Sequence, residues 1–289
     1  MRQQERIVAF QRAVWKHYRA DGRHDLPWRQ PTLKLRYGKQ DFDPYKILVS
    51  EVMLQQTQVP RVLEKYKEFL RAFPTVHALA RAPLADVLRV WSGMGYNRRA
   101  KYLREAAKVI VGEYGGRVPK DAATLRTIPG IGPYTASAVL IFAFNTPDTM
   151  IETNIRAAFI YHFASGKAGS TLRGLGGAER LINDRDLLPL ITKAAEGQDP
   201  REWHWALMDY GSHLKKIHGN PARKSAHHVR QSKFEGSIRQ VRGAILRELH
   251  KGPSFVKGLP FEKAKVQSAL AGLARDGLVK KEKGKWRIS

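Results

Sequence analysis

The stretch Thr127-Ile128-Pro129-Gly130-Ile131-Gly132-Pro133-Tyr134-Thr135 separates two segments whose apolar residues recur at helical spacing. Its two glycines, one residue apart, allow a tight turn with exposed backbone N–H groups before an apolar helix predicted over 136–144. Such a turn can hold a phosphate without sequence preference. A lone Gly-x-Gly pair is more often an ordinary connection between helices. In this strongly basic chain we predict a phosphate-binding helix-hairpin-helix with contacts from Ile128, Gly130, Ile131, Gly132 and Thr135.

The charge of the chain favours a polyanionic partner. Its 289 residues include 51 Lys+Arg and 26 Asp+Glu, which gives a net charge of +25. An excess of that size attracts nucleic acid or an anionic membrane at long range. No apolar run approaches the ~20 residues of a membrane span, and residues 1–20 lack the apolar stretch of a signal peptide. We expect a soluble protein without membrane insertion, cytoplasmic, and nucleoid-associated if bacterial or archaeal.

Cysteine is absent from the sequence. Disulfide scaffolds, cysteine-ligated zinc, iron–sulfur clusters and thiol nucleophiles are therefore excluded. We expect no metal and no cofactor, and in particular no iron–sulfur cluster.

The apolar pattern predicts an all-α core followed by a smaller basic domain. Helical spacing runs from about residue 2 to residue 218, and Asp43-Pro44 opens one of the helices as cap and first-turn proline. A Gly/Ser-rich loop is predicted at 166–177. Because the chain is too long for one typical compact domain, we divide it into a core (1–217), a basic linker or arm (218–236) and a C-terminal domain (237–289).

The last quarter of the chain is the most basic part. Residues 218–289 hold seventeen Lys+Arg and five acidic residues, close to half of the net charge. Helical patterns over 237–250 and 261–275 precede an apolar–turn–apolar pattern around 282–285, which predicts a hairpin. This order resembles a winged helix, and because basic residues crowd the hairpin we predict that it contacts DNA. The alternative is a structural cap with solvated charges.

Two carboxylates are candidates for catalysis. Glu51 stands on the apolar face of the predicted helix 47–54, and burial without a countercharge raises a carboxyl pKa and keeps the group protonated. Glu152, eighteen residues after Tyr134, starts a further helix, where the dipole and unpaired N–H groups stabilise an ionised carboxylate. The alternatives are a Glu51–arginine pair and a helix-capping Glu152. One neutral and one ionised acid form the arrangement that cleaves a glycosidic bond.

Four motifs together resemble those of the MutY adenine DNA glycosylases, over about residues 5–215. They are Asp25-Leu26-Pro27-Trp28-Arg29, Ser50-Glu51-Val52-Met53-Leu54-Gln55-Gln56-Thr57-Gln58-Val59, Trp91-Ser92-Gly93-Met94-Gly95-Tyr96, and the hairpin through Glu152. Their shared order is specific for the helix-hairpin-helix glycosylase superfamily. The resemblance implies an enzyme that flips a base out of duplex DNA containing a lesion or mismatch and cuts its glycosidic bond. We expect it to act as a monomer.

The resemblance also implies roles for individual residues. Glu51 matches the acid that protonates the expelled base, and Glu152 matches the second acid, an aspartate in the family. Tyr134 takes the position of lysine in the bifunctional glycosylase-lyases, and without that amine Schiff-base chemistry has no obvious nucleophile. A monofunctional glycosylase is therefore implied. The residues expected to line the base pocket or wedge into the duplex are Trp28, Leu54, Gln55, Gln56, Tyr96 and Trp205. Core packing is the alternative for Trp28 and Tyr96.

Departures from the family pattern keep rival functions open. Glu152 is one methylene longer than aspartate, and Trp205 stands where an acid that recognises adenine is expected. The C-terminal domain does not resemble the larger, sheet-based module for 8-oxoguanine. The leading prediction is excision of adenine opposite 8-oxoguanine or guanine. A thymine, uracil or hypoxanthine glycosylase is the first alternative, since Tyr134 suits those branches. A catalytically silent lesion-binding protein is the second, and a transcription regulator ranks last.

Overall fold

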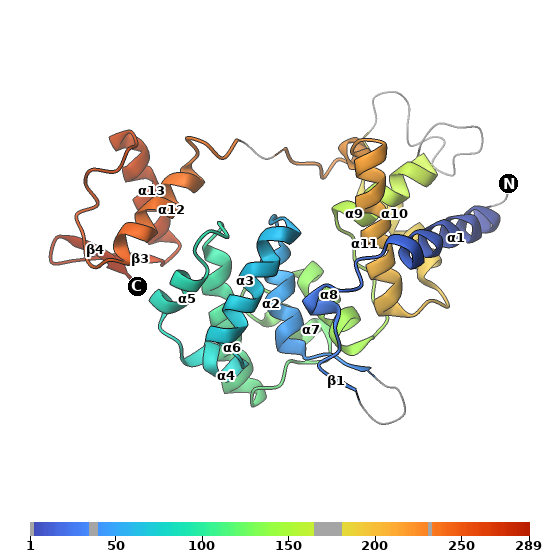
Figure 1. Cartoon of the computed structure of the whole chain (residues 1–289), viewed down its shortest axis with the longest axis horizontal. Coiled ribbons are helices and arrows are strands. Elements are labelled where there is room, and N and C mark those ends of the chain that lie inside the picture. The colour runs from blue at the N-terminus through green and yellow to red at the C-terminus, as the bar shows by residue number, and fades with distance from the viewer. Residues whose placement is uncertain (1–2, 35–39, 165–180, 231–232) are drawn as a thin grey trace. The chain divides into compact units, whose positions relative to one another are not determined.

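The computed structural model describes residues 3–34, 40–164, 181–230 and 233–289 (Figure 1). The chain forms two compact units. The first unit consists of residues 1–42 and 136–230, and the second of residues 43–135 and 231–289. The domain boundaries drawn from the sequence remain a prediction.

The first unit is built mainly of long helices that pack around aromatic side chains. Its elements are α1 (Gln3–Asp21), η1 (Pro27–Arg29), β1 (Leu33–Lys34), β2 (Gln40–Asp41), α8 (Pro133–Phe144) from residue 136 onward, α9 (Thr153–Phe159), η3 (Ile160–Ala164), α10 (Asp184–Ala195), α11 (Pro200–Ile217) and η4 (Pro221–Lys224). Helix α11 packs against α1 and α9. Phe10 of α1 lies 4.7 Å from Phe159 and 6.2 Å from Trp203, measured between ring centroids, and all three side chains are buried. This aromatic cluster fixes α9 in the unit.

A glycine sets the approach of α11 to α9. A Cβ atom on Gly211 would lie 2.0 Å from the carbonyl oxygen of Asn154. Such a contact is shorter than any real side chain tolerates, so a larger residue would push the two helices apart. Gly211 therefore determines the position of the helix that begins at Thr153.

The second unit surrounds the helix over 44–54, most of whose residues are buried. Its elements are α2 (Pro44–Leu54), α3 (Val59–Ala72), α4 (Val76–Arg81), α5 (Leu84–Val90), α6 (Arg98–Tyr114), α7 (Ala122–Thr127), the start of α8 (Pro133–Phe144), α12 (Ile238–Leu249), α13 (Lys263–Arg275), β3 (Val279–Glu282) and β4 (Lys285–Ile288). The side chain of Asp43 accepts hydrogen bonds from the backbone N–H groups of Tyr45 and Lys46, and Pro44 is the first helical residue. The predicted start of this helix is confirmed, because the cap satisfies N–H groups that the helix leaves unpaired.

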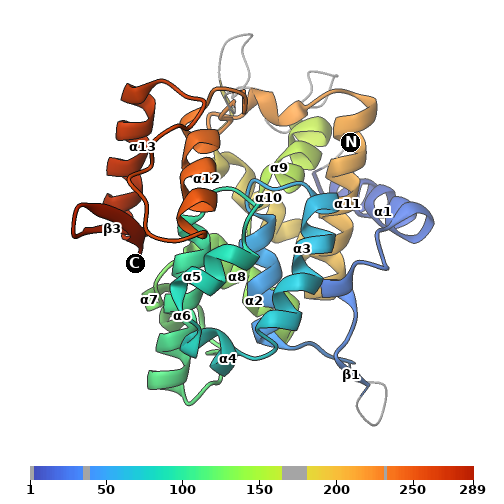
Figure 2. The same ribbon diagram turned by 60° about the vertical axis from the view of Figure 1, so that its left-hand side comes forward.

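Residues 237–289, which we name the C-terminal module, follow the predicted order of helix, helix and hairpin. Helices α12 and α13 lie side by side next to the hairpin (Figure 2). Strands β3 and β4 pair antiparallel, and the turn residues Lys283 and Gly284 both have positive φ, as a tight hairpin requires. An additional bridge joins Ser254 to Trp286. The winged-helix assignment remains a prediction that this order supports.

The predicted all-α fold class is confirmed, with two local differences. Strands β1 and β2 form a small antiparallel pair that the sequence did not indicate, since two-residue strands are too short to show alternation. The predicted linker begins with a folded segment, because η4 follows α11 and Ser225, 2% exposed, bridges to Ile182. The predicted loop at 166–177 lies outside the described residues. Within the part of the chain that the structure describes, no helix is long and apolar enough to cross a membrane.

Candidate active site

The hairpin between α7 and α8 has the predicted form. Ile128 and Ile131 are buried, whereas Gly130 and Gly132 are exposed. Gly130 has φ +80°, and a Cβ atom there would lie 2.5 Å from the Cβ of Tyr102. Only glycine fits both constraints. The two isoleucines thus anchor a turn whose glycine backbone faces solvent at the start of α8, the arrangement that suits a phosphate oxygen.

Glu51 lies where the hairpin meets α2. Its side chain is the only acidic group of α2 and is 4% exposed. The hydroxyl of Tyr134, the second residue of α8, donates a hydrogen bond of 3.1 Å to Glu51 Oε2. Burial of Glu51 among apolar residues is therefore as predicted, and Tyr134 is a neighbour that directly orients it. The role of Glu51 as an acid remains a prediction at this point.

Arg99 of α6 holds the loops next to Glu51, and sequence reasoning missed it. Its guanidinium donates to the carbonyl oxygens of Val52 (2.8 Å) and Met53 (3.0 Å) at the C-terminal end of α2, and to the Thr57 hydroxyl (3.0 Å). It also donates to the carbonyl oxygen of Gly95 at 3.3 Å. Burial lowers the pKa of Arg99 to about 10. The side chain satisfies carbonyl groups that the end of α2 leaves unpaired.

The predicted wedge residues lie in the two loops that Arg99 joins. Gln55 Nε2 donates to the Thr135 hydroxyl at 3.2 Å, which links the wedge to the hairpin. Gln56 has φ +53° and Tyr96 has φ +46°. Left-handed backbone at a non-glycine residue costs free energy and persists only where the surroundings impose it. Leu54, the last residue of α2, is half-buried. Both wedge loops are therefore held in conformations that a free loop would leave.

Glu152 belongs to the first unit and caps α9. Its Oε1 accepts the backbone N–H groups of Asn154 (2.7 Å) and Ile155 (2.8 Å). Burial raises the pKa of Glu152, and these two donors together with the charges of Lys215 and Arg156 limit the rise. The predicted position at a helix start is confirmed. Glu152 also caps the helix, as the alternative interpretation expected. The backbone N–H groups therefore hold the carboxylate whether or not it takes part in catalysis.

Trp28 and Trp205, also in the first unit, are both buried. Trp205 stacks on Phe142 with the ring centroids 5.8 Å apart, and the guanidinium of Arg29 lies 5.3 Å from its ring. Arg29 in turn donates to both carboxylate oxygens of Asp209, at 2.8 and 2.9 Å. The burial of Trp28 fits its core-packing alternative, and a role in a base pocket remains a prediction for both tryptophans.

The buried ion pair next to Trp205 was not foreseen. Burial alone would raise the pKa of Asp209, but Arg29 and Arg23 lower it below its usual value. Asp209 lies four residues after Trp205 on the buried face of α11. Asp209 stands among apolar residues on one face of its helix, and this position could have indicated from the sequence that the acid is buried and needs a positively charged partner. The partner, Arg29, belongs to a motif far away in the sequence.

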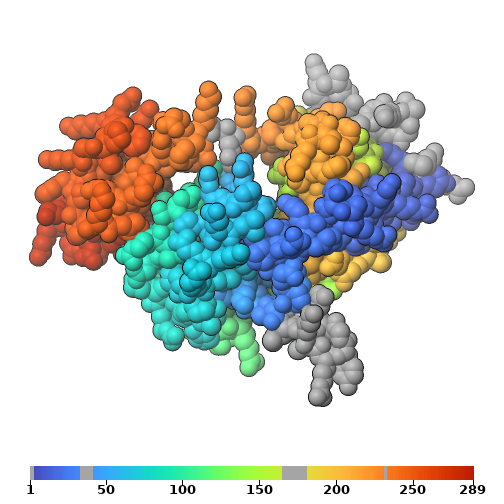
Figure 3. Space-filling view, in the orientation of Figure 1, coloured from blue at the N-terminus to red at the C-terminus, as the bar shows by residue number. Residues whose placement is uncertain are grey.

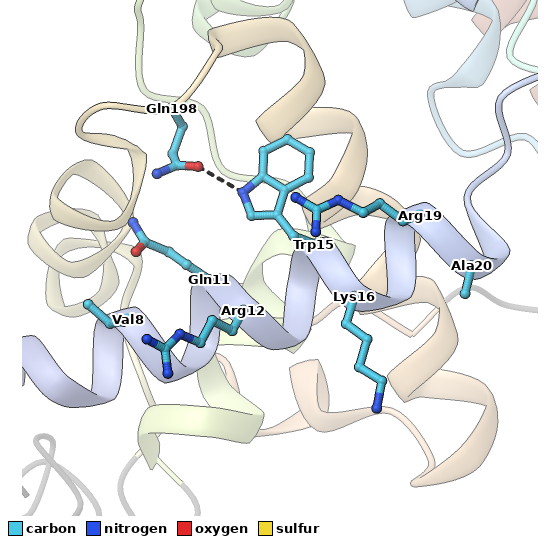
Figure 4. A pocket seen from close by; sticks show the side chains of 8 residues that line it. All are labelled: Val8, Gln11, Arg12, Trp15, Lys16, Arg19, Ala20 and Gln198. Carbon is cyan, nitrogen blue, oxygen red and sulfur yellow. Dashed lines mark hydrogen bonds between the residues drawn. The ribbon is translucent and has the colours of Figure 1, made fainter.

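A separate pocket of about 760 Å³ lies against α1 in the first unit. Arg12, Lys16 and Arg19 line it, and Trp15 donates a hydrogen bond of 2.8 Å to the side chain of Gln198 (Figure 4). Helix α1 forms part of the surface of the unit (Figure 3). None of the predicted site residues lines this pocket. Among the described residues, no group of three His, Asp or Glu side chains is placed to hold a metal ion.

Comparison with known proteins defines the class to which this fold and hairpin belong. The model of the HhH-GPD superfamily, base excision DNA repair proteins, matches residues 49–184. The solved structure of a thermostable thymine-DNA glycosylase superimposes with a TM-score of 0.60 at 24% identity, over 77% of this chain and 94% of that chain. The chain thus has the fold of the helix-hairpin-helix base excision repair proteins.

Relatives that are similar in sequence narrow the family to which the chain is assigned. The adenine DNA glycosylase of Mycolicibacterium smegmatis is 36% identical over 274 residues, which is 89% of this chain and 88% of that protein. A thymine-DNA glycosylase of Aeropyrum pernix is 38% identical over 151 residues, which is 52% of this chain and 63% of that protein. The chain belongs to the adenine DNA glycosylase family. The predicted resemblance and the prediction of a DNA N-glycosylase are confirmed.

Proposed function

We propose that this chain is a monofunctional glycosylase that excises adenine opposite 8-oxoguanine or guanine from duplex DNA. The observation that carries the proposal is the buried Glu51 carboxyl, hydrogen-bonded to the residue that follows the hairpin. Adenine as the substrate is supported by the similarity to the adenine DNA glycosylase of M. smegmatis over most of both chains.

In the proposed reaction Glu51 acts as the general acid. Its proton passes to a ring nitrogen of adenine, the C1′–N9 bond breaks with its electron pair moving to the base, and the sugar becomes an oxocarbenium-like cation. Water then adds to C1′ and returns a proton to Glu51. The products are free adenine and an abasic site. No cofactor takes part in these steps.

Glu152 is proposed as the ionised carboxylate that supports the cationic sugar. A preorganised negative charge stabilises a positive charge that exists only near the transition state. The two N–H donors of α9 and the charge of Lys215 favour the ionised form that this role requires. Glutamate is one methylene longer than aspartate, so the carboxylate reaches further from the backbone than it does in the family pattern.

Tyr134 accounts for a monofunctional reaction. A Schiff base needs an amine, and a tyrosine hydroxyl cannot form one. The Tyr134 hydroxyl instead donates to Glu51. The abasic site is therefore released or held intact, and the DNA strand is not cut.

We propose that DNA binds at the glycine turn between α7 and α8 and at the C-terminal module. Gly130 and Gly132 expose backbone N–H groups to a phosphate, and the hairpin of β3 and β4 adds exposed lysines at 280, 281, 283 and 285. We expect a monomer that acts on DNA in the cytoplasm, associated with the nucleoid if the chain is bacterial or archaeal.

One panel of substrates tests the proposal. Purified full-length protein is incubated with end-labelled duplexes containing A:8-oxoguanine, A:G, T:G, U:G or hypoxanthine:T, and half of each sample is treated with alkali. The proposal predicts breaks with the two adenine duplexes, and only after alkali. Breaks chiefly at T:G would instead support the thymine alternative, which the A. pernix relative favours. Breaks without alkali would contradict a monofunctional reaction, and tight lesion binding without breaks would indicate a silent protein.

A further inference from the structure

The β3–β4 hairpin of the C-terminal module has an inner and an outer face. Side chains alternate between the two faces of a strand, and directly opposed residues of an antiparallel pair share a face. Val279 and Ile288 oppose each other and are buried, on strands that contact α13 and α12. Their face is therefore the inner one. The other face, which we name the outer face, carries four exposed side chains, those of Lys280, Glu282, Lys285 and Arg287.

A third stretch of chain extends this small sheet. The backbone N–H of Ser254 donates to the carbonyl oxygen of Trp286 at 3.0 Å, and the Trp286 N–H donates back to Ser254 at 2.8 Å. Ser254 thus shares the inner face with Trp286, and the next residue, Phe255, falls on the outer face. A Cβ atom on Gly284 would lie 3.8 Å from Phe255 Cε1, so the ring lies beside the turn of the hairpin. The Phe255 side chain is 55% exposed.

The backbone directly after Phe255 is strained. Val256 has φ +53°, a conformation that is rare for a β-branched residue and costs free energy. The Val256 side chain is buried, and its N–H donates to the Ser254 hydroxyl at 3.1 Å. The strained residue is therefore anchored in the module while the ring before it stays in solvent. Strain of this kind persists where the surroundings impose it, and it often marks a surface that contacts a ligand.

Positive charge surrounds the exposed ring. The Nζ atoms of Lys257 and Lys285 each lie 5.6 Å from the centre of the Phe255 ring. Glu282 is the only acid in the sequence of the hairpin, residues 279–288. It accepts a hydrogen bond of 2.7 Å from Arg287 on the same face. The lysines beside the ring are therefore available to attract an anionic ligand.

An exposed aromatic ring between lysines on a sheet face suits an unpaired nucleotide. Every base has a flat face that can stack on an aromatic ring, and basic side chains beside the ring bind the phosphates. A base inside a duplex is already stacked on both sides, so duplex DNA would reach the lysines but not the ring. We propose that the outer face binds single-stranded DNA, with one base stacked on Phe255 and the neighbouring phosphates at Lys257 and Lys285.

This binding surface is separate from the proposed reaction. It rests on the proposed function only in taking DNA as the polyanion that the C-terminal module binds. It involves neither Glu51 nor the predicted wedge residues. The module thereby gains a second mode of DNA binding, in which unpaired bases are recognised by stacking and not by sequence.

Two single-stranded oligomers separate stacking from charge. One is an oligothymidylate about twelve nucleotides long, within the site sizes of ~4–16 nucleotides known for such surfaces. The other is a tetrahydrofuran oligomer of the same length, which has the same phosphates but no bases. Affinity of the full-length protein for each is measured by fluorescence anisotropy. We expect the oligothymidylate to bind about 5- to 100-fold more tightly, on the scale of one stacked base.

Matched variants locate the stacked base. Phe255→Ala should bring the ratio of the two affinities close to one, while affinity for the tetrahydrofuran oligomer stays within about twofold. Phe255→Trp keeps a flat aromatic ring and should retain the preference. Phe234→Ala is the control, because Phe234 is 58% exposed but lies outside the sheet. It should leave the ratio of the two affinities unchanged. Lys285→Ala should weaken both oligomers alike and make the salt dependence shallower.

Two results would overturn the inference. One is equal affinity of the wild-type protein for the two oligomers, which would leave the outer face to duplex DNA or to an acidic protein. The other is an unchanged preference in a Phe255→Ala protein whose thermal melting matches the wild type. Neither measurement needs a lesion or an excision step, so failure of this surface and failure of the proposed reaction are separate outcomes. A protein that excises nothing but loses its preference in Phe255→Ala would retain the surface and lose the reaction.

Discussion

The Tyr134 hydroxyl and the Glu51 carboxyl are joined by a hydrogen bond of 3.1 Å, which connects the hairpin to the acid of α2. The two residues are 83 positions apart in the chain. A phosphate held at the turn before Tyr134 would therefore be placed at a fixed distance from Glu51. This contact would couple the proposed binding of a DNA phosphate at the turn to the orientation of the proposed acid.

Removing the hydroxyl tests this coupling. Tyr134→Phe keeps the ring and deletes the donor, so Glu51 loses the group that orients it. A hydrogen bond between neutral groups contributes ~0.5–1.5 kcal/mol, which predicts a single-turnover excision rate about 2- to 12-fold lower. DNA affinity should change less than about threefold. A variant rate within twofold of the wild-type rate would show that the contact has no part in catalysis.

Substitutions of Glu152 test the proposed charge that supports the sugar cation. Glu152→Gln keeps the shape and removes the charge, so it should lose transition-state stabilisation of ~2.7–4 kcal/mol, the scale for losing one preorganised electrostatic partner. DNA binding should survive. Glu152→Asp keeps the charge but withdraws it towards the backbone. If the site around the sugar is adapted to glutamate at position 152, Glu152→Asp should react more slowly than the wild type.

Single-turnover rates on the best duplex of the panel compare the three proteins. An aspartate variant faster than the wild type would mean that Glu152 is an imperfect replacement for aspartate. Equal rates for all three would leave Glu152 as a cap of α9 and nothing more.

Lys215 should control the pH dependence of the reaction. Burial raises the pKa of Glu152, and the positive charge of Lys215 opposes that rise. Because the proposed role needs the ionised carboxylate, the rate should fall as the pH drops through this pKa. Lys215→Met removes the opposing charge, so the acidic limb of the pH–rate profile should move to higher pH. Lys215→Arg keeps the positive charge and should leave the acidic limb in place. An acidic limb that does not move in Lys215→Met would show that Lys215 does not set the pH dependence through Glu152.

The two hairpin glycines should respond differently to alanine. Gly130 has φ +80°, and its Cβ would meet Tyr102 at 2.5 Å, so Gly130→Ala should destabilise the protein by ~1–3 kcal/mol. At Gly132 an added Cβ meets nothing within 4 Å. Gly132→Ala should therefore melt like the wild type but bind DNA more weakly, because the methyl group projects into the space proposed for a phosphate. Equal melting temperatures for wild type and Gly130→Ala would contradict the account of the turn.

Local signals explain what could be predicted from the sequence. The Asp43 cap, the glycine turn and the apolar run around Glu51 each depend on residues close together in the chain, and the structure places them as expected. Burial of Glu51 followed from its position on an apolar helix face.

Features that depend on distant partners were missed. Arg99 binds carbonyl groups more than 40 positions away, although its place on the stripe with Leu103 and Ala106 marks a charge on a buried face. The Arg29–Asp209 pair spans 180 positions. No periodicity specifies which buried acid meets which arginine, so such pairs need the folded chain.

The most direct measurement is the single-turnover rate of Glu51→Gln on duplex DNA containing A:8-oxoguanine. The amide is nearly isosteric but has no acidic proton to transfer, and a positioned general acid contributes ~10²- to 10⁴-fold in rate. Excision should fall at least about 100-fold, while DNA affinity should stay within a few-fold of the wild type. Retention of more than about a tenth of the wild-type rate would contradict the assignment of Glu51 as the acid that expels the base.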